Sequence, residues 1–336
     1  MNIAIFGATG QVGTVMRTIL EERNFPVDRI RYFASPKSAG KVLSYRGQDV
    51  VVEDAWSGKY DGIDVALFSA GASTSLELAP KVAAQGAIVI DNSSAWRMDP
   101  LVPLVVPEVN GHALSGIPKG IVANPNCTTM ITISALKALD SIGGLTKLVV
   151  STYQAVSGAG LAGVNELSDQ LSGKDGQLAW LAYDGKAVDF GKPSAFAGPI
   201  AANVLPVAGT FTDEETNEEH KFRDESRKIL EIPSLEVSVT CVRVPVFTGH
   251  SVAVYAEMKR EVSSAEATEA IANAPGVRVV DMPTPLEAAG IDDCLVGRIR
   301  KDIGSRPAIN FFVSGDNLRK GAALNTIQIA EALQSM

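Results

Sequence analysis

Short apolar runs alternate with helix-like patterns in the first part of the chain. Helical spacing of apolar residues follows the first run, and further helices are expected over residues 73–84 and 130–139. The apolar runs have the length of strands and cover residues 2–6, 30–34, 64–68, 87–90 and 120–123. Residues 103–110 are expected to be extended. Continuous apolar runs are typical of strands buried on both faces of a parallel sheet, so this part is predicted to be an α/β domain.

The pattern changes in the second part, where the expected strands become longer. Residues 212–230 carry a charged helical pattern, and a last helix from Leu318 onward has an apolar stripe that we expect to pack against the first domain. Strands are expected over residues 148–156, 236–244, 250–258, 295–303 and 309–314. In residues 250–258 one face is apolar and the other is mixed, which is typical of an antiparallel or mixed sheet. The second part is therefore predicted to be an α+β domain with a mixed sheet.

Length and charge limit the possible functions. A chain of 336 residues is too long for one ordinary hydrophobic core, so two domains are expected: residues 1–126 with 317–336, and residues 127–316. The formal net charge of −8 argues against a nucleic-acid-binding surface. Because no apolar run approaches the roughly 18–20 residues that cross a bilayer, no association with a membrane is expected either.

The N-terminus and the cysteines indicate a cytoplasmic protein. The chain begins directly with the first strand pattern and lacks the basic region and cleavage site of a signal peptide. Its three cysteines, Cys127, Cys241 and Cys294, are far apart and have no metal-ligand spacing. We therefore expect thiols in a reducing compartment, and no metal site.

A glycine-rich turn connects the first strand to the helix that follows it. The turn reads Gly7-Ala8-Thr9-Gly10-Gln11-Val12-Gly13. Glycines permit a tight turn and a close approach to a ligand, and N–H groups at a helix start can bind a pyrophosphate. The G-x-x-G-x-x-G spacing differs from the usual G-x-G-x-x-G, and a purely structural turn is the alternative. The position between a strand and a helix favours a Rossmann-like dinucleotide-binding domain.

The end of the second strand indicates which dinucleotide is bound. NAD-preferring domains usually place an acid there to bind the ribose 2′-hydroxyl. In this chain the strand is followed by Ser35-Pro36-Lys37-Ser38-Ala39-Gly40-Lys41, which has hydroxyls and lysines but no acid. These residues suit a 2′-phosphate, so NADP(H) is the predicted cofactor. The alternative for the two lysines is a solvated basic turn.

A cysteine is expected at the start of the helix over residues 130–139. The preceding residues read Asn124-Pro125-Asn126-Cys127-Thr128-Thr129. Pro125 favours an extended Asn124, and Asn126 or Thr128 can cap the helix. Unpaired N–H groups and the helix dipole stabilise an anion at this place, and a thiolate is a good nucleophile. The alternative is a buried, inert cysteine.

His250 and Arg243 are candidates for proton transfer and for anion binding. His250 follows a turn that leads into a strand, and Arg243 ends the preceding strand. Strands joined by this turn would place both side chains at one rim, where the guanidinium could bind a carboxylate through two hydrogen bonds. A rim salt bridge is the alternative for Arg243. His112 and His220 are expected to be solvated.

Several motifs together resemble those of the aspartate-semialdehyde dehydrogenase family over essentially the whole chain. They include the glycine-rich turn, the cysteine motif, and the segment from Arg243 to Val246 with His250. The other matching stretches are Asp91–Arg97 (DNSSAWR), Val106–Asn110 (VPEVN), Gln154–Gly160 (QAVSGAG), Glu218–Lys221 (EEHK) and Gly315–Ala323 (GDNLRKGAA). Separate motifs in the right order are much more specific than any one of them, although residues 160–210 are the least diagnostic.

The resemblance implies an NADPH-dependent enzyme that converts 4-phospho-L-aspartate to L-aspartate 4-semialdehyde and inorganic phosphate, on the route to lysine, methionine and threonine. It implies Cys127 as the nucleophile, His250 as the acid/base and Gln154 as the residue that orients the acyl group. Its substrate-binding residues would be Arg243 for the α-carboxylate, Glu218 for the amino group, and Arg97, Asn126 and Lys221 for the phosphate. Its cofactor-binding residues would be Gly7, Thr9, Gly10, Gln11, Val12, Gly13, Ser35, Lys37, Ser38, Ser157, Gly158 and Asn317. Family members are usually homodimers built through the second domain.

Three other functions compete with this interpretation. A reductase for N-acyl-γ-glutamyl phosphate would have the same general design, although Glu218 favours a substrate with a free amine. A non-catalytic, NADPH-sensing Rossmann protein would leave Cys127, Gln154, Arg243 and His250 unexplained. A thiol hydrolase would have no use for the dinucleotide loop.

Overall fold

The computed structural model describes residues 1–56 and 59–336 of the chain. These residues form two compact units. The first unit consists of residues 1–137, 224–233 and 318–336, and the second of residues 138–223 and 234–317. Within the described residues, no helix is both long and apolar enough to cross a membrane.

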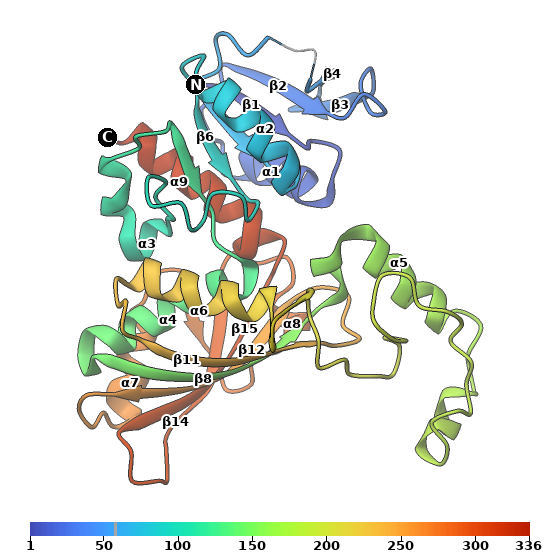
Figure 1. Ribbon diagram of the computed structural model, residues 1–336, viewed down its shortest axis with the longest axis vertical. Coiled ribbons are helices and arrows are strands. Elements are labelled where there is room, and N and C mark those ends of the chain that lie inside the picture. The colour runs from blue at the N-terminus through green and yellow to red at the C-terminus, as the bar shows by residue number, and fades with distance from the viewer. Residues whose placement is uncertain (57–58) are drawn as a thin grey trace. The chain divides into compact units, whose positions relative to one another are not determined.

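The first unit is a doubly wound α/β structure, in agreement with the alternating pattern of the sequence (Figure 1). Its sheet has the order β3-β4-β2-β1-β5-β6-β7, and only β3 and β4 pair antiparallel. Its strands are β1 (Asn2–Phe6), β2 (Arg29–Ala34), β3 (Val42–Tyr45), β4 (Gln48–Asp54), β5 (Val65–Phe68), β6 (Ile88–Asp91) and β7 (Ile121–Ala123). Its helices include α1 (Gln11–Glu22), α2 (Ala72–Ala83), α3 (Pro107–Asn110), the 3-10 turn η1 (Gly111–Ser115), the π-helical turn η4 (Arg319–Leu324) and α9 (Asn325–Gln334).

The core of this unit explains why its strands could be predicted from the sequence. The middle of the sheet is buried on both faces, as in β5, where all four residues are buried. Ile327 and Ala330 of α9 are buried in the same hydrophobic cluster as Ile3 and Ile5 of β1. The last helix therefore packs on the first unit, as its apolar stripe predicts.

The second unit is built on a mixed sheet with the order β11-β8-β12-β15-β14-β13. β8 pairs parallel with β11 and antiparallel with β12. One sheet face is buried and the other is partly exposed, as the alternation along β12 predicts. The strands are β8 (Leu145–Gln154), β9 (Phe211–Thr212), β10 (Glu215–Thr216), β11 (Glu236–Arg243), β12 (His250–Met258), β13 (Val277–Val279), β14 (Cys294–Lys301) and β15 (Ala308–Gly315).

Helices and 3-10 turns complete the second unit. The segment from α5 through η3 extends away from the mixed sheet (Figure 1). Two helices, α4 and α6, contribute residues to both units. The helical elements are α4 (Cys127–Gly143), η2 (Val156–Ala159), α5 (Gly160–Leu171), η3 (Leu178–Ala182), α6 (Asn217–Leu230), α7 (Ser264–Ala272) and α8 (Pro285–Ala288).

Two segments differ from the sequence-based expectation. The charged helix begins at Asn217 rather than at residue 212, because residues 211–216 form the hairpin β9–β10, whose turn contains Asp213 with φ 61°. Residues 107–110 are helical rather than extended. Pro107 starts this short helix α3, where the missing N–H of a proline has no effect on the helical hydrogen bonds.

Candidate functional site

Cys127 is the first residue of α4 and is partly exposed. The chain leaves β7 through Asn124 and Pro125 before the helix begins. The Asn126 side chain caps the helix, because its Oδ1 accepts hydrogen bonds from Thr128 N at 3.0 Å and from Thr128 Oγ1 at 2.5 Å. The cap by Asn126 and the place of the Cys127 thiol at the helix start both agree with the sequence-based prediction.

Arg97 lies beside this turn in the same unit and is buried. Its Nε donates to Asn124 O at 2.9 Å, and its Nη2 donates to Asn92 O at 2.7 Å. Its Nη1 donates to Glu225 Oε1 of α6, also at 2.9 Å. The other oxygen of Glu225 accepts from Asn126 N at 2.6 Å. Arg97 and the residue before Cys127 are therefore held by one buried carboxylate.

Three strand ends bring Gln154, Arg243 and His250 together in the second unit. Gln154 ends β8 and is in register with Arg243, which ends β11. His250 starts β12 on the other side of β8. The main chain of Ala155 connects the group: its carbonyl accepts from Arg243 Nη1 at 2.7 Å, and its N–H donates to His250 Nδ1 at 2.9 Å. The strands joined by the turn at residues 244–249 are thus not neighbours in the sheet.

His250 is fully buried and neutral. Burial is the main cause that lowers the pKa of its imidazole to about 3, and the nearby Arg243 lowers it further, while Glu218 opposes the shift. Because Nδ1 accepts a hydrogen bond, the proton of the neutral ring is on Nε2. This Nε2 is buried and has no hydrogen-bond partner among the described residues. A buried donor without a partner is rare in proteins and indicates a position for a ligand oxygen.

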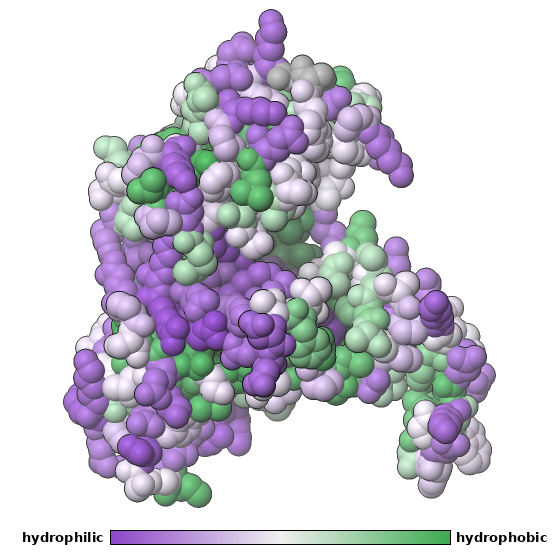
Figure 2. Space-filling model, in the orientation of Figure 1, coloured by the Kyte–Doolittle hydropathy of each residue, from purple (hydrophilic) through white to green (hydrophobic). Residues whose placement is uncertain are grey.

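Glu218 and Lys221 come from the first turns of α6, over which hydrophilic side chains gather in Figure 2. Lys221 Nζ lies 2.6 Å from Glu218 Oε1. The second oxygen, Glu218 Oε2, accepts from Gln154 Nε2 at 3.3 Å. The structure therefore connects the acid of this helix to Gln154 at the strand ends.

The glycine-rich turn has the geometry of a nucleotide-binding loop. Gly7 has φ 84°, and a Cβ atom there would lie 2.2 Å from Ser69 O. A Cβ atom at Gly13 would lie 2.4 Å from Gly7 O, so α1 can pack closely on the turn only because this residue is glycine. Among the residues that the structure describes, no side chain caps the N-terminus of α1 at Gly10, which leaves the first helical N–H groups accessible to a pyrophosphate. Three other residues of the turn are partly exposed: Thr9, Gln11 and Val12.

The loop after β2 carries the residues predicted to select the nucleotide. Ser35 and Lys37 are exposed and Ser38 is partly exposed. The loop closes through a hydrogen bond from Ser38 N to Ser35 O at 2.8 Å. The selection of a 2′-phosphate by these hydroxyls and lysines stays a prediction.

Ser157, Gly158 and Asn317 lie together in the second unit. Asn317 Nδ2 donates to Ser157 Oγ at 2.9 Å, and Asn317 Oδ1 accepts from Gly249 N at the same distance. A Cβ atom at Gly158 would lie 2.8 Å from Arg243 Nη1 and 3.1 Å from His250 Nε2. The described structure thus places these three residues beside the strand-end cluster.

Two contributors were missed by the reading of the sequence. Ala155 contacts Arg243 and His250 through main-chain atoms, so its residue type does not indicate this role. Glu225 does give one: it lies among the buried positions of α6 between Phe222 and Ile229. A carboxylate in the apolar stripe of a helix requires a partner, and that alone marks it as a residue to examine.

These features define the class of the protein. A parallel sheet with a glycine-rich turn before its first helix is a dinucleotide-binding unit. A cysteine at a helix start is a position that favours a thiolate nucleophile. Together these features indicate a dinucleotide-dependent oxidoreductase.

Comparison with known proteins narrows this class. Residues 2–117 match the family model "Semialdehyde dehydrogenase, NAD binding domain", and residues 136–320 match "Semialdehyde dehydrogenase, dimerisation domain". The aspartate-semialdehyde dehydrogenase of Streptomyces akiyoshiensis is 58% identical over 98% of each chain, and that of Aquifex aeolicus is 48% identical over 98% of this chain and 97% of its own. The crystal structure of aspartate semialdehyde dehydrogenase II from Vibrio cholerae is 41% identical, with a TM-score of 0.92 over 99% of this chain and 98% of that one.

This chain belongs to the aspartate-semialdehyde dehydrogenase family.

Proposed function

We propose that this protein converts 4-phospho-L-aspartate to L-aspartate 4-semialdehyde and inorganic phosphate, with NADPH as the reductant. The observation that carries the proposal is Cys127 at the capped start of α4, in a chain that resembles aspartate-semialdehyde dehydrogenases over its full length. A related structure from Vibrio cholerae, 41% identical, is described as complexed with ASA. The reaction would belong to the biosynthesis of lysine, methionine and threonine.

Cys127 is the proposed nucleophile. Its thiolate attacks the acyl carbon, a C–S bond forms, and the C–O bond to phosphate breaks, which leaves a thioester and inorganic phosphate. A thioester accepts a hydride more readily than a carboxylate does. NADPH, when bound, supplies that hydride. Breaking the C–S bond then releases the aldehyde and restores the thiolate for another cycle.

His250 and Gln154 act on the acyl oxygen in this proposal. In the neutral imidazole the Nε2–H is the group that can donate to this oxygen and share its proton as the intermediate forms and collapses. The hydrogen bond from Ala155 N fixes the ring, so the donor is oriented before the substrate arrives. Gln154 orients the acyl group from the end of β8.

The remaining polar residues would hold the charged groups of the substrate. Arg243 suits the α-carboxylate because a guanidinium binds carboxylates through two parallel hydrogen bonds. Glu218 suits the α-amino group. The phosphate would be held by Arg97, Asn126 and Lys221. Because Lys221 is paired with Glu218, we expect substrate binding to replace that ion pair with two separate contacts.

NADPH would be held mainly by the first unit. The uncapped start of α1 suits its pyrophosphate, and the basic loop after β2 suits its 2′-phosphate. The residues proposed to contact it are Gly7, Thr9, Gly10, Gln11, Val12, Gly13, Ser35, Lys37, Ser38, Ser157, Gly158 and Asn317. In functional terms, residues 1–126 with 317–336 would form the dinucleotide-binding domain and residues 127–316 the catalytic and dimerisation domain.

The test is nicotinamide absorbance in the reverse direction. Purified protein is mixed with L-aspartate 4-semialdehyde and NADP, with and without inorganic phosphate. Phosphate-dependent formation of NADPH is the expected result. A folded protein that binds NADPH but forms none would contradict the proposal, and the glutamyl-type aldehyde would be the next substrate to test. The same assay with NAD measures the preference for NADP.

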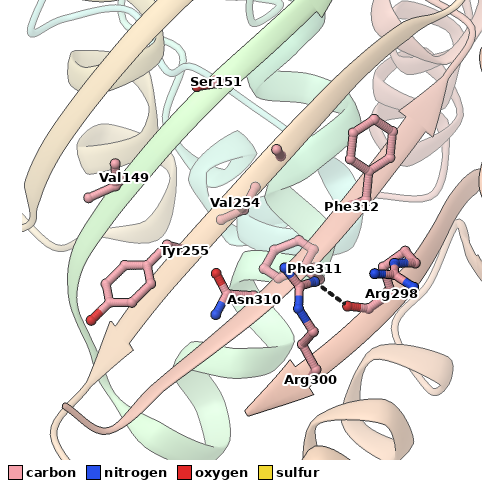
Figure 3. A pocket seen from close by; sticks show the side chains of 10 residues that line it. Val149, Ser151, Val254, Tyr255, Arg298, Arg300, Asn310, Phe311 and Phe312 are labelled. Carbon is pink, nitrogen blue, oxygen red and sulfur yellow. Dashed lines mark hydrogen bonds between the residues drawn. The ribbon is translucent and has the colours of Figure 1, made fainter. Parts of the chain in front are cut away.

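We also propose that the protein is a homodimer and that it works in the cytoplasm, because a reducing compartment suits a catalytic thiol. The family model for residues 136–320 is named a dimerisation domain. In this unit Val149, Tyr255 and Phe312 project from the partly exposed face of the mixed sheet, around a hollow of about 290 Å³ (Figure 3). An uncovered face that carries aromatic and aliphatic side chains suits the same face of a second copy, as in a two-fold dimer.

A further inference from the structure

Glu225 is a buried acid that the proposed reaction does not use directly. It lies on α6 and is only 1% exposed. Its two oxygens accept hydrogen bonds from Arg97 Nη1 and from the main-chain N–H of Asn126. All three residues belong to the first compact unit. One carboxylate therefore contacts two of the groups proposed to bind the phosphate.

The contact with Arg97 fixes the orientation of the guanidinium. A guanidinium has five N–H donors, and the hydrogen bonds of Arg97 to the described residues use one on each of its three nitrogens. The carbonyls of Asn92 and Asn124 hold it at two points, and Glu225 is the only charged partner among these three acceptors. Each terminal nitrogen retains one further N–H, which is what a phosphate oxygen requires.

The contact with Asn126 fixes the backbone next to the nucleophile. Asn126 precedes Cys127 directly, and its side chain caps α4 through Thr128. A hydrogen bond to an ionised carboxylate is stronger than one between neutral groups, and the distance of 2.6 Å agrees with that. Glu225 therefore sets the position of the turn from which the thiol and the capping amide both project.

We propose that Glu225 is a positioning residue for the phosphate subsite, in that it holds Arg97 and the Asn126 main chain in the arrangement that receives the leaving group. This inference rests on the function proposed above. Glutamine at residue 225 would have one acceptor oxygen and an amide that is itself a donor, so it cannot accept from Arg97 and Asn126 as a carboxylate does. It would also leave the buried guanidinium without its negative partner.

The test compares Glu225→Gln, Glu225→Asp and the control Glu219→Gln. Glu219 is a matched control because it is buried on the same helix and accepts from two backbone N–H groups, Thr216 N and Cys241 N, but does not contact Arg97. In the reverse reaction we expect Glu225→Gln to raise the KM for inorganic phosphate at least about tenfold, since hydrogen bonds to charged groups are lost. The KM for NADP should stay within about twofold of wild type. Glu225→Asp, which retains the charge, should give an intermediate value.

A second measurement does not depend on turnover. Iodoacetamide should alkylate Cys127 faster than the buried Cys241 and Cys294, and mass spectrometry identifies the site. Inorganic phosphate is expected to slow alkylation of Cys127 in the wild type and in Glu219→Gln, but to have a much weaker effect in Glu225→Gln. If phosphate protects the wild type but not Glu225→Gln, and the wild type forms no NADPH, the proposed reaction fails while the role of Glu225 stands.

Two results would overturn the role of Glu225. One is a folded Glu225→Gln variant with wild-type KM for phosphate and wild-type protection of Cys127. The other is an equal rise in the KM values for phosphate, NADP and L-aspartate 4-semialdehyde that Glu219→Gln reproduces. Such a rise would indicate a general structural effect of removing a buried acid from α6.

Discussion

His250 combines complete burial with a hydrogen bond that one ring nitrogen must accept. Both features oppose protonation, because a charged imidazolium would lose hydration and would place a second N–H against the N–H of Ala155. The pKa of about 3 in the folded protein contrasts with about 6.5 in an unfolded chain. The unfolded state therefore binds the proton first as the pH falls.

This difference predicts a loss of stability in acid. Well above about pH 6.5 both states are neutral, and His250 contributes no pH dependence. Between about pH 6.5 and 3 the unfolded state binds more protons, so the free energy of unfolding falls as pH decreases. From pH 7.5 to pH 5.0 the contribution of this one histidine is about 2 kcal/mol. Urea unfolding at the two pH values measures it.

His250→Asn isolates the effect in that experiment. The Asn side chain has an oxygen that can accept a hydrogen bond from Ala155 N, but it has no titrating group. The free energy of unfolding of the variant should therefore fall by about 2 kcal/mol less than that of the wild type over the same pH interval. Equal losses in the two proteins would show that His250 is readily protonated in the folded state.

Cys127 gives a prediction that separates chemistry from folding. Cys127→Ala should abolish turnover, since no other side chain in the proposal forms the thioester. The binding of NADPH, measured by fluorescence, and the thermal midpoint should remain close to wild type, because the residue is partly exposed at the start of a helix that Asn126 caps. A variant that unfolds or loses NADPH binding would weaken the catalytic assignment.

The cysteine was predictable because its position depends on local chemistry. Pro125 ends the strand and Asn126 caps the next helix, and both effects act within a few residues. The peptide of Ala155 was not predictable, since it binds residues 88 and 95 positions away through main-chain atoms. Glu225 is intermediate: its burial could be inferred from the helical period, but its partners Arg97 and Asn126 could not.

The 3-10 turn η2 shows how an element controls the side chains beside it. At Gly158 an added methyl group would lie within 3.1 Å of Arg243 Nη1 and His250 Nε2. Gly158→Ala is expected to shift both side chains and to lower kcat/KM roughly 10- to 100-fold. The free energy of unfolding should change by less than about 1 kcal/mol, because the crowded atoms belong to the ends of side chains.

Gly185→Ala is the matched control for Gly158→Ala. Gly185 has open space around its Cα, so a methyl group there meets no atom of the described residues within 4 Å. Steady-state kinetics and urea unfolding should give wild-type values for Gly185→Ala. Wild-type kinetics for Gly158→Ala as well would mean that the cluster of Arg243 and His250 adjusts without cost.

At the level of elements, the sequence was most informative where burial was greatest. The central strands of the first sheet have continuous apolar runs, and their expected ranges agree with β1, β2, β5, β6 and β7 to within a residue or two. The hairpin β3–β4 was not anticipated, because much of it is exposed and its residues lack a buried pattern. The hairpin β9–β10 was missed for the same reason: two-residue strands have no period to detect.

The whole molecule is proposed to be a dimer, and the uncovered face of the mixed sheet provides the test. Val149→Asp should produce a monomer, because an unpaired carboxylate would be buried against the same face of the second copy. Val149 is 43% exposed in the single chain, so the substitution should leave the fold of the isolated chain intact. Size-exclusion chromatography with light scattering measures the mass.

Val51→Asp serves as the control for the introduced charge. Val51 lies on β4 of the other unit and is 57% exposed. This variant should keep the mass of the wild type. A dimeric Val149→Asp variant would contradict the proposed use of this face, and a monomeric wild type would contradict the homodimer itself.

At the scale of the molecule, the sequence predicted the classes of the two sheets but not the order of strands. The order β11-β8-β12 depends on pairing between segments about 90 residues apart, and local periodicity has no information about such pairing. This order is what places His250 and Arg243 on opposite sides of β8. Their separation in sequence is short, but their meeting depends on a strand from a distant part of the chain.

The main chain of Ala155 makes contacts that side-chain substitutions cannot probe. Methods that replace one side chain after another would record Ala155 as a small residue that merely tolerates little volume. They would not detect that its main-chain N–H contacts His250 and its main-chain carbonyl contacts Arg243. A backbone ester in place of the amide at residue 155 would remove the single N–H that faces His250 Nδ1 and leave every side chain intact. Chemical synthesis of the main chain, rather than genetic substitution, is therefore the way to reach the centre of this cluster.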